Sequence, residues 1–315
     1  MQRTLADLTL RLADAVGADR VQLDASLAPL TTFKVGGPAD WLVSTGSAEE
    51  VRRIVRAASD AGVPVTVLGG GSNVLVADAG IRGVVIRMRS GDVQAVDESR
   101  VRADAGVTIN GLVRWTVGRG LQGLEAWAGT PGTVGGAVRG NAHFKGRLIG
   151  ELITQVELVS PSGELIALDG SAMEFAYDRS RVQRTGEIVV SADFRVCPGD
   201  TAALRAIARE SLAFRKRTQP LESASAGCIF QNPDPRDARV PADIPPSAGA
   251  LVDRAGLKGA REGGATVSPA HGNFIVNDGT ATAAEIRTLI ARCRDAVRAR
   301  FGVELHEEIV YLGAW

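Results

Sequence analysis

The sequence contains little cysteine and no excess of charge of either sign. Only three of its 315 residues are cysteines, and no two of them form a Cys-x-x-Cys pair. This argues against a disulfide framework and a zinc knuckle, and it is typical of a protein kept in a reducing compartment. Lys plus Arg and Asp plus Glu both number 36, so the formal net charge is zero. Because phosphate binding normally needs a basic excess, a nucleic-acid-binding protein is not expected.

Long apolar runs are missing as well. No stretch approaches the roughly 20 apolar residues of a membrane-spanning helix. Asp7, Arg11 and Asp14 stand where a secretion signal would need an apolar run, so we expect a cytoplasmic protein. Hydrophobic residues nevertheless make up 45% of the chain, which excludes a disordered or fibrous protein. The histidines are scattered and predict no metal site: His143, His271 and His306.

Apolar periodicity predicts a mixture of helices and strands. An amphipathic helix followed by a connector opens the chain, and further helices are expected from residue 47, at 108–118 and at 282–300. Two helices begin with a capping box, Ser47 with Glu50 and Thr282 with Glu285. Strands are expected at 41–43, 63–68, 84–88, 101–105, 188–196 and 307–312, with a hairpin at 151–168.

The pattern breaks at residues 197–199, where we place a domain boundary. An arginine-rich helix is expected after it, through residue 216. The segment 232–247 contains five prolines and is expected to be a loop.

Glycine clusters in two runs. The first follows a predicted buried strand and reads Gly69, Gly70, Gly71, Ser72 and Asn73. Consecutive glycines allow successive N–H groups to converge, as in loops that cradle a pyrophosphate, although a tight turn between strands is the alternative. Neither the P-loop nor the Rossmann spacing is present.

The second glycine run covers residues 129–142. It contains Gly132, Thr133, Gly135 and Gly136. Two such runs in one half of a protein favour an extended, phosphate-containing ligand such as a dinucleotide, approached by backbone from two sides.

Two further places carry chemistry-bearing residues. Cys228 stands beside glycine in the run at 225–233, where it could be a nucleophile, a proton donor or a small buried hydrophobe. Glu307 and Glu308 are adjacent in a predicted strand and would point to opposite faces, although both could simply be exposed.

Taken together, these runs resemble the UDP-N-acetylenolpyruvoylglucosamine reductase family, also called MurB. The resemblance extends in family order over nearly the whole chain, through 31–39, both glycine runs, 225–233, 255–259, 271–277 and 308–313. It resembles the shorter subtype that lacks a tyrosine-bearing loop. It implies an α+β fold with a two-lobed FAD-binding domain of the vanillyl-alcohol-oxidase/PCMH type and a C-terminal α+β substrate-binding domain. The expected parts are lobe I at 1–88, lobe II at 89–199 and the substrate domain at 200–315.

The resemblance also implies an activity. NADPH would reduce non-covalently bound FAD, and the hydride would then pass to C3 of UDP-N-acetylglucosamine enolpyruvate, with protonation at C2 giving UDP-N-acetylmuramate. This is a step of peptidoglycan precursor synthesis and so of cell-wall formation, cell shape and division. We expect a monomeric bacterial enzyme of the cytoplasm, with no nucleic-acid or membrane partner. Covalent flavin attachment is not expected, because the first glycine run contains neither His nor Cys.

The resemblance assigns site residues by motif position. Cys228 would be the proton donor, where the family more often has serine, and Glu308 the catalytic glutamate with Glu307 as its solvated neighbour. The cofactor would contact Gly69, Gly70, Gly71, Ser72 and Asn73, with Gly132, Thr133, Gly135 and Gly136 as a second wall.

Two departures from the family pattern affect the site. The family has arginine directly after the tyrosine, whereas here Tyr177 is followed by Asp178 and then Arg179. Arg179 is the candidate cation, but a shift of one residue in an extended segment reverses the face, so a bulge or loop is required. Arg181 shares the face of Arg179 in an extended segment, so it would need the same bulge or loop. His143 and Phe144 stand where the family commonly has glycine and an aromatic residue.

Two alternatives to the reductase are retained. One is another FAD-dependent oxidoreductase of the same superfamily, such as a sugar or alcohol oxidase. The other is a catalytically silent relative that binds FAD or a UDP-sugar.

Overall fold

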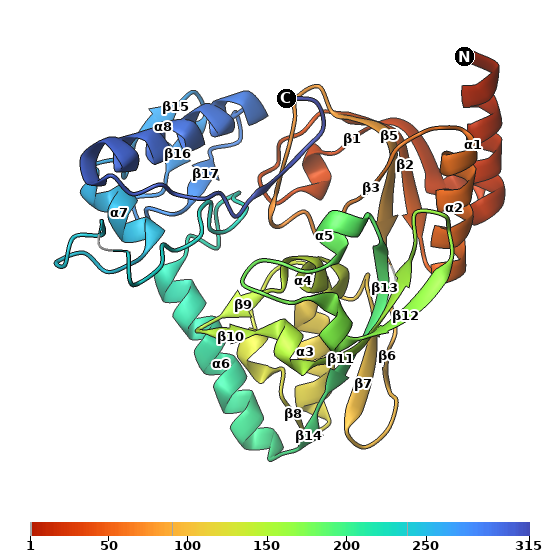
Figure 1. The fold of residues 1–315 in the computed structure, drawn as a ribbon, viewed down its shortest axis with the longest axis horizontal. Coiled ribbons are helices and arrows are strands. Elements are labelled where there is room, and N and C mark those ends of the chain that lie inside the picture. The colour runs from red at the N-terminus through yellow and green to blue at the C-terminus, as the bar shows by residue number, and fades with distance from the viewer. Residues whose placement is uncertain (1, 90, 238) are drawn as a thin grey trace. The chain divides into compact units, whose positions relative to one another are not determined.

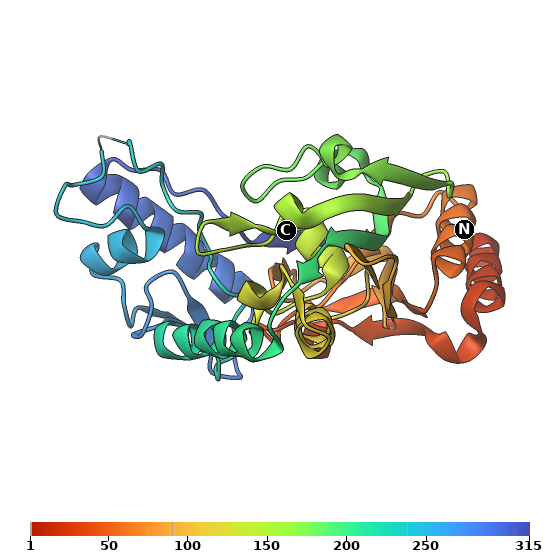
Figure 2. The same ribbon diagram turned by 90° about the horizontal axis from the view of Figure 1, so that it is seen from below.

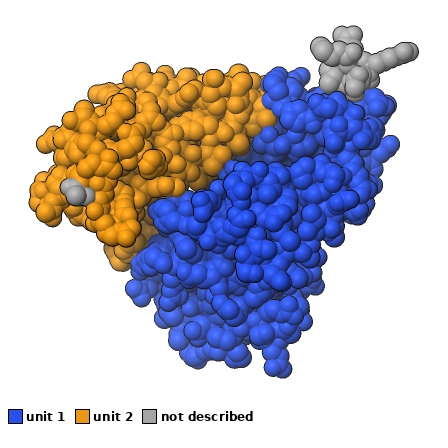
Figure 3. All heavy atoms as spheres, viewed as in Figure 1, with its two compact units in different colours: residues 1–25, 39–70, 82–213 blue, residues 26–38, 71–81, 214–315 orange. Residues whose placement is uncertain are grey.

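The computed structural model describes residues 2–89, 91–237 and 239–315, and the chain forms two compact units (Figure 3). Unit 1 comprises residues 1–25, 39–70 and 82–213, and unit 2 comprises residues 26–38, 71–81 and 214–315. The chain therefore passes between the units several times, and the last passage lies within helix α6 (Thr201–Thr218).

The first sheet of unit 1 has four strands in the order β1-β2-β5-β3. Their bounds are β1 (Val21–Ser26), β2 (Pro38–Thr45), β5 (Ile81–Met88) and β3 (Val65–Val67). Helices α1 (Gln2–Val16) and α2 (Ala48–Asp60) pack together beside it (Figure 1). Leu8, Leu12 and Ile54 are buried with Val84 of the sheet, because each helix directs one apolar stripe inward.

The second sheet of unit 1 has five strands in the order β12-β11-β13-β7-β6, and all neighbours are antiparallel. The green strands in Figure 2 belong to this sheet. They are β12 (Leu165–Asp169), β11 (Ile153–Val159), β13 (Ile188–Arg195), β7 (Arg100–Asp104) and β6 (Val93–Ala95). Its core includes Leu112 and Val117 of α3 (Ile109–Gly118) and Val138 of α4 (Val134–Gly140), packed with Trp127 and Phe194.

Short elements complete unit 1. Two strand pairs join β8 (Leu121–Gln122) to β14 (Cys197–Pro198) and β9 (His143–Phe144) to β10 (Arg147–Leu148). The single-turn helices of this unit are η1 (Ala18–Arg20), η3 (Glu125–Trp127), η4 (Ile149–Leu152), η5 (Gly170–Met173) and α5 (Val182–Thr185).

Unit 2 packs two helices over small sheets. Its elements are η2 (Ala28–Leu30), α7 (Ala248–Arg254), α8 (Ala283–Phe301), β4 (Val74–Val76), β15 (Arg261–Glu262), β16 (Ala265–Val267), β17 (Ile275–Asn277) and β18 (Val310–Leu312). Strands β4 and β18 are parallel, with Val74 opposite Val310. Leu251 of α7 and Ile290 of α8 are fully buried in the same core as Phe33, so the short stretch 26–38 is built into this unit.

Most of the expected elements are present. The helices expected at 108–118 and 282–300 and the hairpin at 151–168 are confirmed, and the Thr282–Glu285 capping box forms in both directions. At α2 the Ser47 hydroxyl accepts from the Glu50 N–H as predicted, but the Glu50 carboxylate accepts from the Gly46 N–H and pairs with Arg20. The predicted Ser47–Glu50 box is thus wrong in its second half, because the Glu50 carboxylate binds Arg20 and the Gly46 N–H.

Three local expectations are wrong. Strand β1 occupies part of the expected opening connector, and helix α4 lies inside the second glycine run. The last strand begins at Val310 and not at residue 307. Among the described residues, no helix is long and apolar enough to cross a membrane.

Candidate functional site

The two glycine runs contact each other within unit 1. A Cβ atom added at Gly70 would lie 2.7 Å from the Gly132 Cα, and one added at Gly69 would lie 2.9 Å from the Thr133 Oγ1. Any side chain at Gly70 would therefore collide with the backbone of the second run. Bare backbone from two loops is what a pyrophosphate cradle requires, and this arrangement fits a dinucleotide such as FAD.

The second run is fixed to the start of α3. The Asn110 side chain accepts a hydrogen bond from the Gly129 N–H (2.7 Å) and donates one to the Thr130 carbonyl (3.3 Å). The Ile109 N–H donates to the carbonyl of Gly132, whose φ of +97° requires glycine. Asn110 was missed by sequence reasoning, because no local motif marks it and only the fold brings it to the loop.

The remainder of the first run, from Gly71 onward, belongs to unit 2. The Thr32 N–H and hydroxyl both donate to the Gly71 carbonyl, at 3.0 and 3.1 Å. The Asn73 side chain donates to the backbone carbonyl of Glu308 (3.1 Å), and the Val310 N–H donates to the Asn73 carbonyl. The glycine run is thus joined directly to the segment that carries the predicted catalytic glutamate.

Cys228 and Glu308 are brought together in unit 2. The Glu308 N–H donates to the carbonyl of Ile229, the residue after Cys228, at 2.8 Å. The buried Asn273 side chain clamps the same loop, because it accepts from the Phe230 N–H (2.9 Å) and donates to the Phe230 carbonyl (2.8 Å). Asn273 lies in the run 271–277 that carries the family resemblance, but sequence reasoning gave it no role.

Cys228 has a cationic neighbour. Arg215 of α6 is only 6% exposed, and burial lowers its pKa to about 10, although its attraction to Cys228 opposes that shift. Cys228 itself is partly exposed, unlike Cys293, which is buried in the core. A guanidinium near a thiol favours release of its proton, so this environment suits an acid. Sequence reasoning missed Arg215 because α6 carries several arginines.

The prediction of a solvated Glu307 is wrong. Its carboxylate pairs with Arg294 of α8 at 2.8 Å and accepts a hydrogen bond from Tyr311. Burial, followed by the negative charge of Glu307, raises the pKa of the Tyr311 hydroxyl well above its usual range. The reason is tertiary, since α8 brings a cation to this face of the chain.

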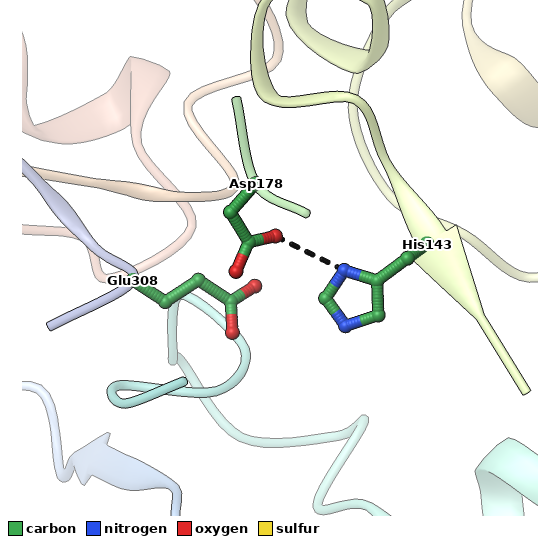
Figure 4. Close-up of side chains that lie close together, drawn as sticks. All are labelled: His143, Asp178 and Glu308. Carbon is green, nitrogen blue, oxygen red and sulfur yellow. Dashed lines mark hydrogen bonds and ion pairs between the residues drawn. The ribbon is translucent and has the colours of Figure 1, made fainter. Parts of the chain in front are cut away.

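The displaced arginine lies in a tight turn and not in an extended strand. Ala176 and Arg179 exchange two backbone hydrogen bonds of 3.0 Å, and Asp178 between them has a φ of +52°. The loop geometry that a shift of one residue requires is therefore present. Arg179 is exposed, whereas the Asp178 carboxylate faces His143 within the same unit (Figure 4).

Arg181 is committed to another partner. Its guanidinium donates to both carboxylate oxygens of Glu187, at 2.9 and 3.0 Å. This pair holds the pKa of the Glu187 carboxyl below its usual range and raises that of Arg181. The charge of Arg181 is thus already offset by Glu187.

Comparison with protein families matches two parts of the chain. Residues 219–312 match the family described as "UDP-N-acetylenolpyruvoylglucosamine reductase, C-terminal domain", and residues 39–169 match an FAD binding domain.

Individual relatives agree with these matches. The UDP-N-acetylenolpyruvoylglucosamine reductase of Heliobacterium modesticaldum is 41% identical over 90% of this chain and 88% of its own. That of a Synechococcus strain is 38% identical over 93% of both chains. The crystal structure of the corresponding reductase (MurB) from Thermus caldophilus has a TM-score of 0.75 and 33% identity, covering 93% of this chain and 98% of that one.

A more distant likeness concerns the fold alone. The grass pollen allergen Phl p 4, which has glucose dehydrogenase activity, has a TM-score of 0.51 at 16% identity and covers 62% of this chain and 45% of its own. The FAD-binding part and the C-terminal part together give the α+β fold expected from the sequence.

Proposed function

The chain belongs to the UDP-N-acetylenolpyruvoylglucosamine reductase family, and from this membership we propose which of its residues perform the reaction. It is an FAD-dependent oxidoreductase that reduces UDP-N-acetylglucosamine enolpyruvate to UDP-N-acetylmuramate with NADPH, in peptidoglycan precursor synthesis. The observation that carries the assignment of roles is the backbone hydrogen bond between Glu308 and Ile229, because it holds Cys228 and Glu308 in one small region of unit 2.

The glycine runs are proposed to hold the cofactor. When bound, FAD would supply the redox chemistry, the passage of a hydride from NADPH to C3 of the enolpyruvyl group. Gly69 and Gly70 with Gly132 present backbone in unit 1, and Asn110 and Thr32 fix the shape of the loops. The other residues assigned to this role are Gly71, Ser72, Asn73, Thr133, Gly135 and Gly136.

Cys228 is proposed as the proton donor. As a hydride forms the new C3–H bond, the electron pair of the C2–C3 double bond moves to C2 and its carboxylate. The thiol proton of Cys228 then forms the C2–H bond, leaving a thiolate that Arg215 stabilises by its charge. An ordinary thiol, with a pKa of about 8.5, is mostly protonated at neutral pH and releases its proton far more readily than an alcohol.

Glu308 and Arg179 are proposed to complete the catalytic set. Glu308 is positioned through its backbone by Ile229 and Asn73, so its carboxylate projects from a fixed point near the Cys228 loop. We assign it to the region of the substrate carboxylate, as motif position implies. Arg179, at the end of the tight turn, is the arginine available to offset the negative charge of the reaction.

Anaerobic stopped-flow measurement of the two half-reactions tests this assignment. We expect Cys228→Ala to be reduced by NADPH at the normal rate, but to be reoxidised by the enolpyruvyl substrate about a hundredfold more slowly, in the range of general acid catalysis. Cys228→Ser should retain measurable turnover, because a hydroxyl can occupy the same position.

The alternatives give different results in the same experiment. Equal reoxidation of wild type and Cys228→Ala would make Cys228 a packing residue. A protein that binds the substrate but is never bleached by NADPH would be the silent relative.

We also propose that the enzyme acts as a monomer in the bacterial cytoplasm, which rests on the resemblance. Sedimentation velocity of the flavin-loaded protein should then give a single species near 32.9 kDa. A species of twice that mass would contradict the monomer.

A further inference from the structure

The two departures from the family pattern contact each other. His143 begins strand β9, and its Nδ1 lies 3.0 Å from the Oδ1 of Asp178, which is 35 residues further along the chain (Figure 4). The Asp178 side chain is only 11% exposed, and that of His143 is 26% exposed. Partial shielding from water strengthens the electrostatic attraction between such groups.

Both nitrogens of the His143 ring have a partner in the tight turn at 176–179. The Tyr177 hydroxyl lies 3.4 Å from Nε2, and the two rings are 4.6 Å apart between centroids. Asp178 adopts a left-handed backbone conformation that is uncommon for residues other than glycine but tolerated by aspartate. The turn therefore holds the imidazole in one orientation.

The turn at 176–179 is fastened to helix α4, which lies within the second glycine run. Asn141, fully buried at the end of α4, donates to the Ala176 carbonyl (2.8 Å) and accepts from the Gly150 N–H (2.8 Å). Ser180 donates to the Arg139 carbonyl at 2.6 Å. Helix α4 has seven residues and is about 10 Å long. It begins just after Gly132, which contacts Gly70, and the His143–Asp178 pair lies past its other end.

The chemistry of the reaction requires positive charge. Hydride addition to C3 moves an electron pair onto C2 and the adjoining carboxylate, and a fixed cation lowers the energy of that state. Arg181 is bound to both carboxylate oxygens of Glu187, and Arg179 is exposed to solvent. A second proton on the His143 ring would lie beside the Asp178 carboxylate, whose negative charge stabilises it.

We propose that protonated His143, oriented by Asp178 and Tyr177, stabilises the negative charge that develops on the substrate. This rests on the proposed function. His143 exchanges no proton in this role: the hydride goes to C3 and the proton of Cys228 goes to C2. Asp178 and Tyr177 are positioning residues, and Arg179 contributes less than His143.

The first test compares the half-reactions of single variants. We expect His143→Gln to be reduced by NADPH within about twofold of wild type, but to be reoxidised by the substrate about a hundredfold more slowly, as for loss of one charge-stabilising group. The matched control is Arg184→Gln, which removes a cation from the same segment that is paired with Glu174 at the surface. It should change reoxidation by less than about twofold.

Restoring a cation distinguishes charge stabilisation from a structural role. In the His143→Gln background, Asp178→Arg should recover at least about tenfold of the lost reoxidation rate, because it returns positive charge to the turn. If His143 merely held the turn at 176–179 in place, the second change would recover no rate. Failure of the double variant to recover any rate would overturn the proposal.

A readout independent of turnover completes the test. Nitrogen-15 NMR of histidine-labelled flavoprotein at neutral pH should show His143 protonated on both nitrogens, and Asp178→Asn should reduce that signal. A neutral ring in wild type would overturn the proposal, as would a larger loss of reoxidation in Arg179→Gln than in His143→Gln. If NADPH never bleaches the flavin of the wild type, the proposed function fails. The NMR measurement then still shows whether His143 is protonated beside Asp178.

Discussion

His271 illustrates how a single residue links protonation to folding in unit 2. Its Nδ1 accepts a hydrogen bond from the Asn273 N–H (3.2 Å), and its ring lies edge-on to Phe274. Burial, and then the nearby charge of Lys258, lower the pKa of His271 below its usual 6.5. Because the Asn273 side chain also clamps the loop after Cys228, the neutral state of this ring supports the segment proposed to be catalytic.

The sign of the pH effect follows from that shift. In the unfolded chain His271 takes up a proton near pH 6.5, whereas the folded protein resists protonation to a lower pH. The free energy of unfolding should therefore fall as the pH is lowered below 6.5. Urea unfolding at neutral and mildly acidic pH should show a smaller fall for His271→Gln, whose amide can still accept from Asn273. An equal fall in both proteins would contradict the prediction.

At the scale of elements, helix α8 is capped by its own sequence and by a distant loop. Thr282 and Glu285 form the local capping box, with distances of 3.2 and 2.9 Å. The Asp78 carboxylate, 205 residues earlier, accepts from the N–H groups of Ala283 and Ala284 at 2.8 and 3.0 Å. The sequence predicted the box, because its residues are three apart, but it gave no sign of Asp78.

Removal of this second cap should destabilise the protein. We expect Asp78→Ala to lower the free energy of unfolding by about 1 kcal/mol, since two N–H groups and the positive helix terminus lose their partner. Chemical denaturation measures this difference. The matched control is Asp295→Ala on the exposed face of α8, where the 3.0 Å pair with Arg298 should be worth less than about 0.5 kcal/mol. Equal effects of both changes would show that Asp78 is no cap.

At the scale of the whole molecule, we expect cofactor retention to depend on the contact between two glycine runs that are distant in the sequence. Gly70→Ala would place a methyl group 2.7 Å from the Gly132 Cα, where only backbone can move. We expect this variant to fold but to lose most of its flavin during purification, measured as the ratio of flavin to protein absorbance. Gly140→Ala is the matched control, because a Cβ there meets nothing within 4 Å and alanine favours the helix. Full flavin content in Gly70→Ala would refute the role of the loop contact.

The sequence by itself determined the elements whose causes are local. Capping residues three apart set the start of α8, a turn at 160–163 set the β11–β12 hairpin, and motif order identified the family before any fold was known. It could not determine α4, because glycine has a poor helix propensity and the turn of α4 is held by packing against β13.

Only the tertiary structure decided the contacts that shape the site. Gly70 against Gly132, Asn73 on the Glu308 carbonyl, and His143 beside Asp178 each join residues that no local pattern relates. Hydrogen bonding within a helix or hairpin repeats at a fixed spacing, so the sequence displays it. A long-range contact depends on how whole elements pack, and its residues become neighbours only when the chain between them has folded.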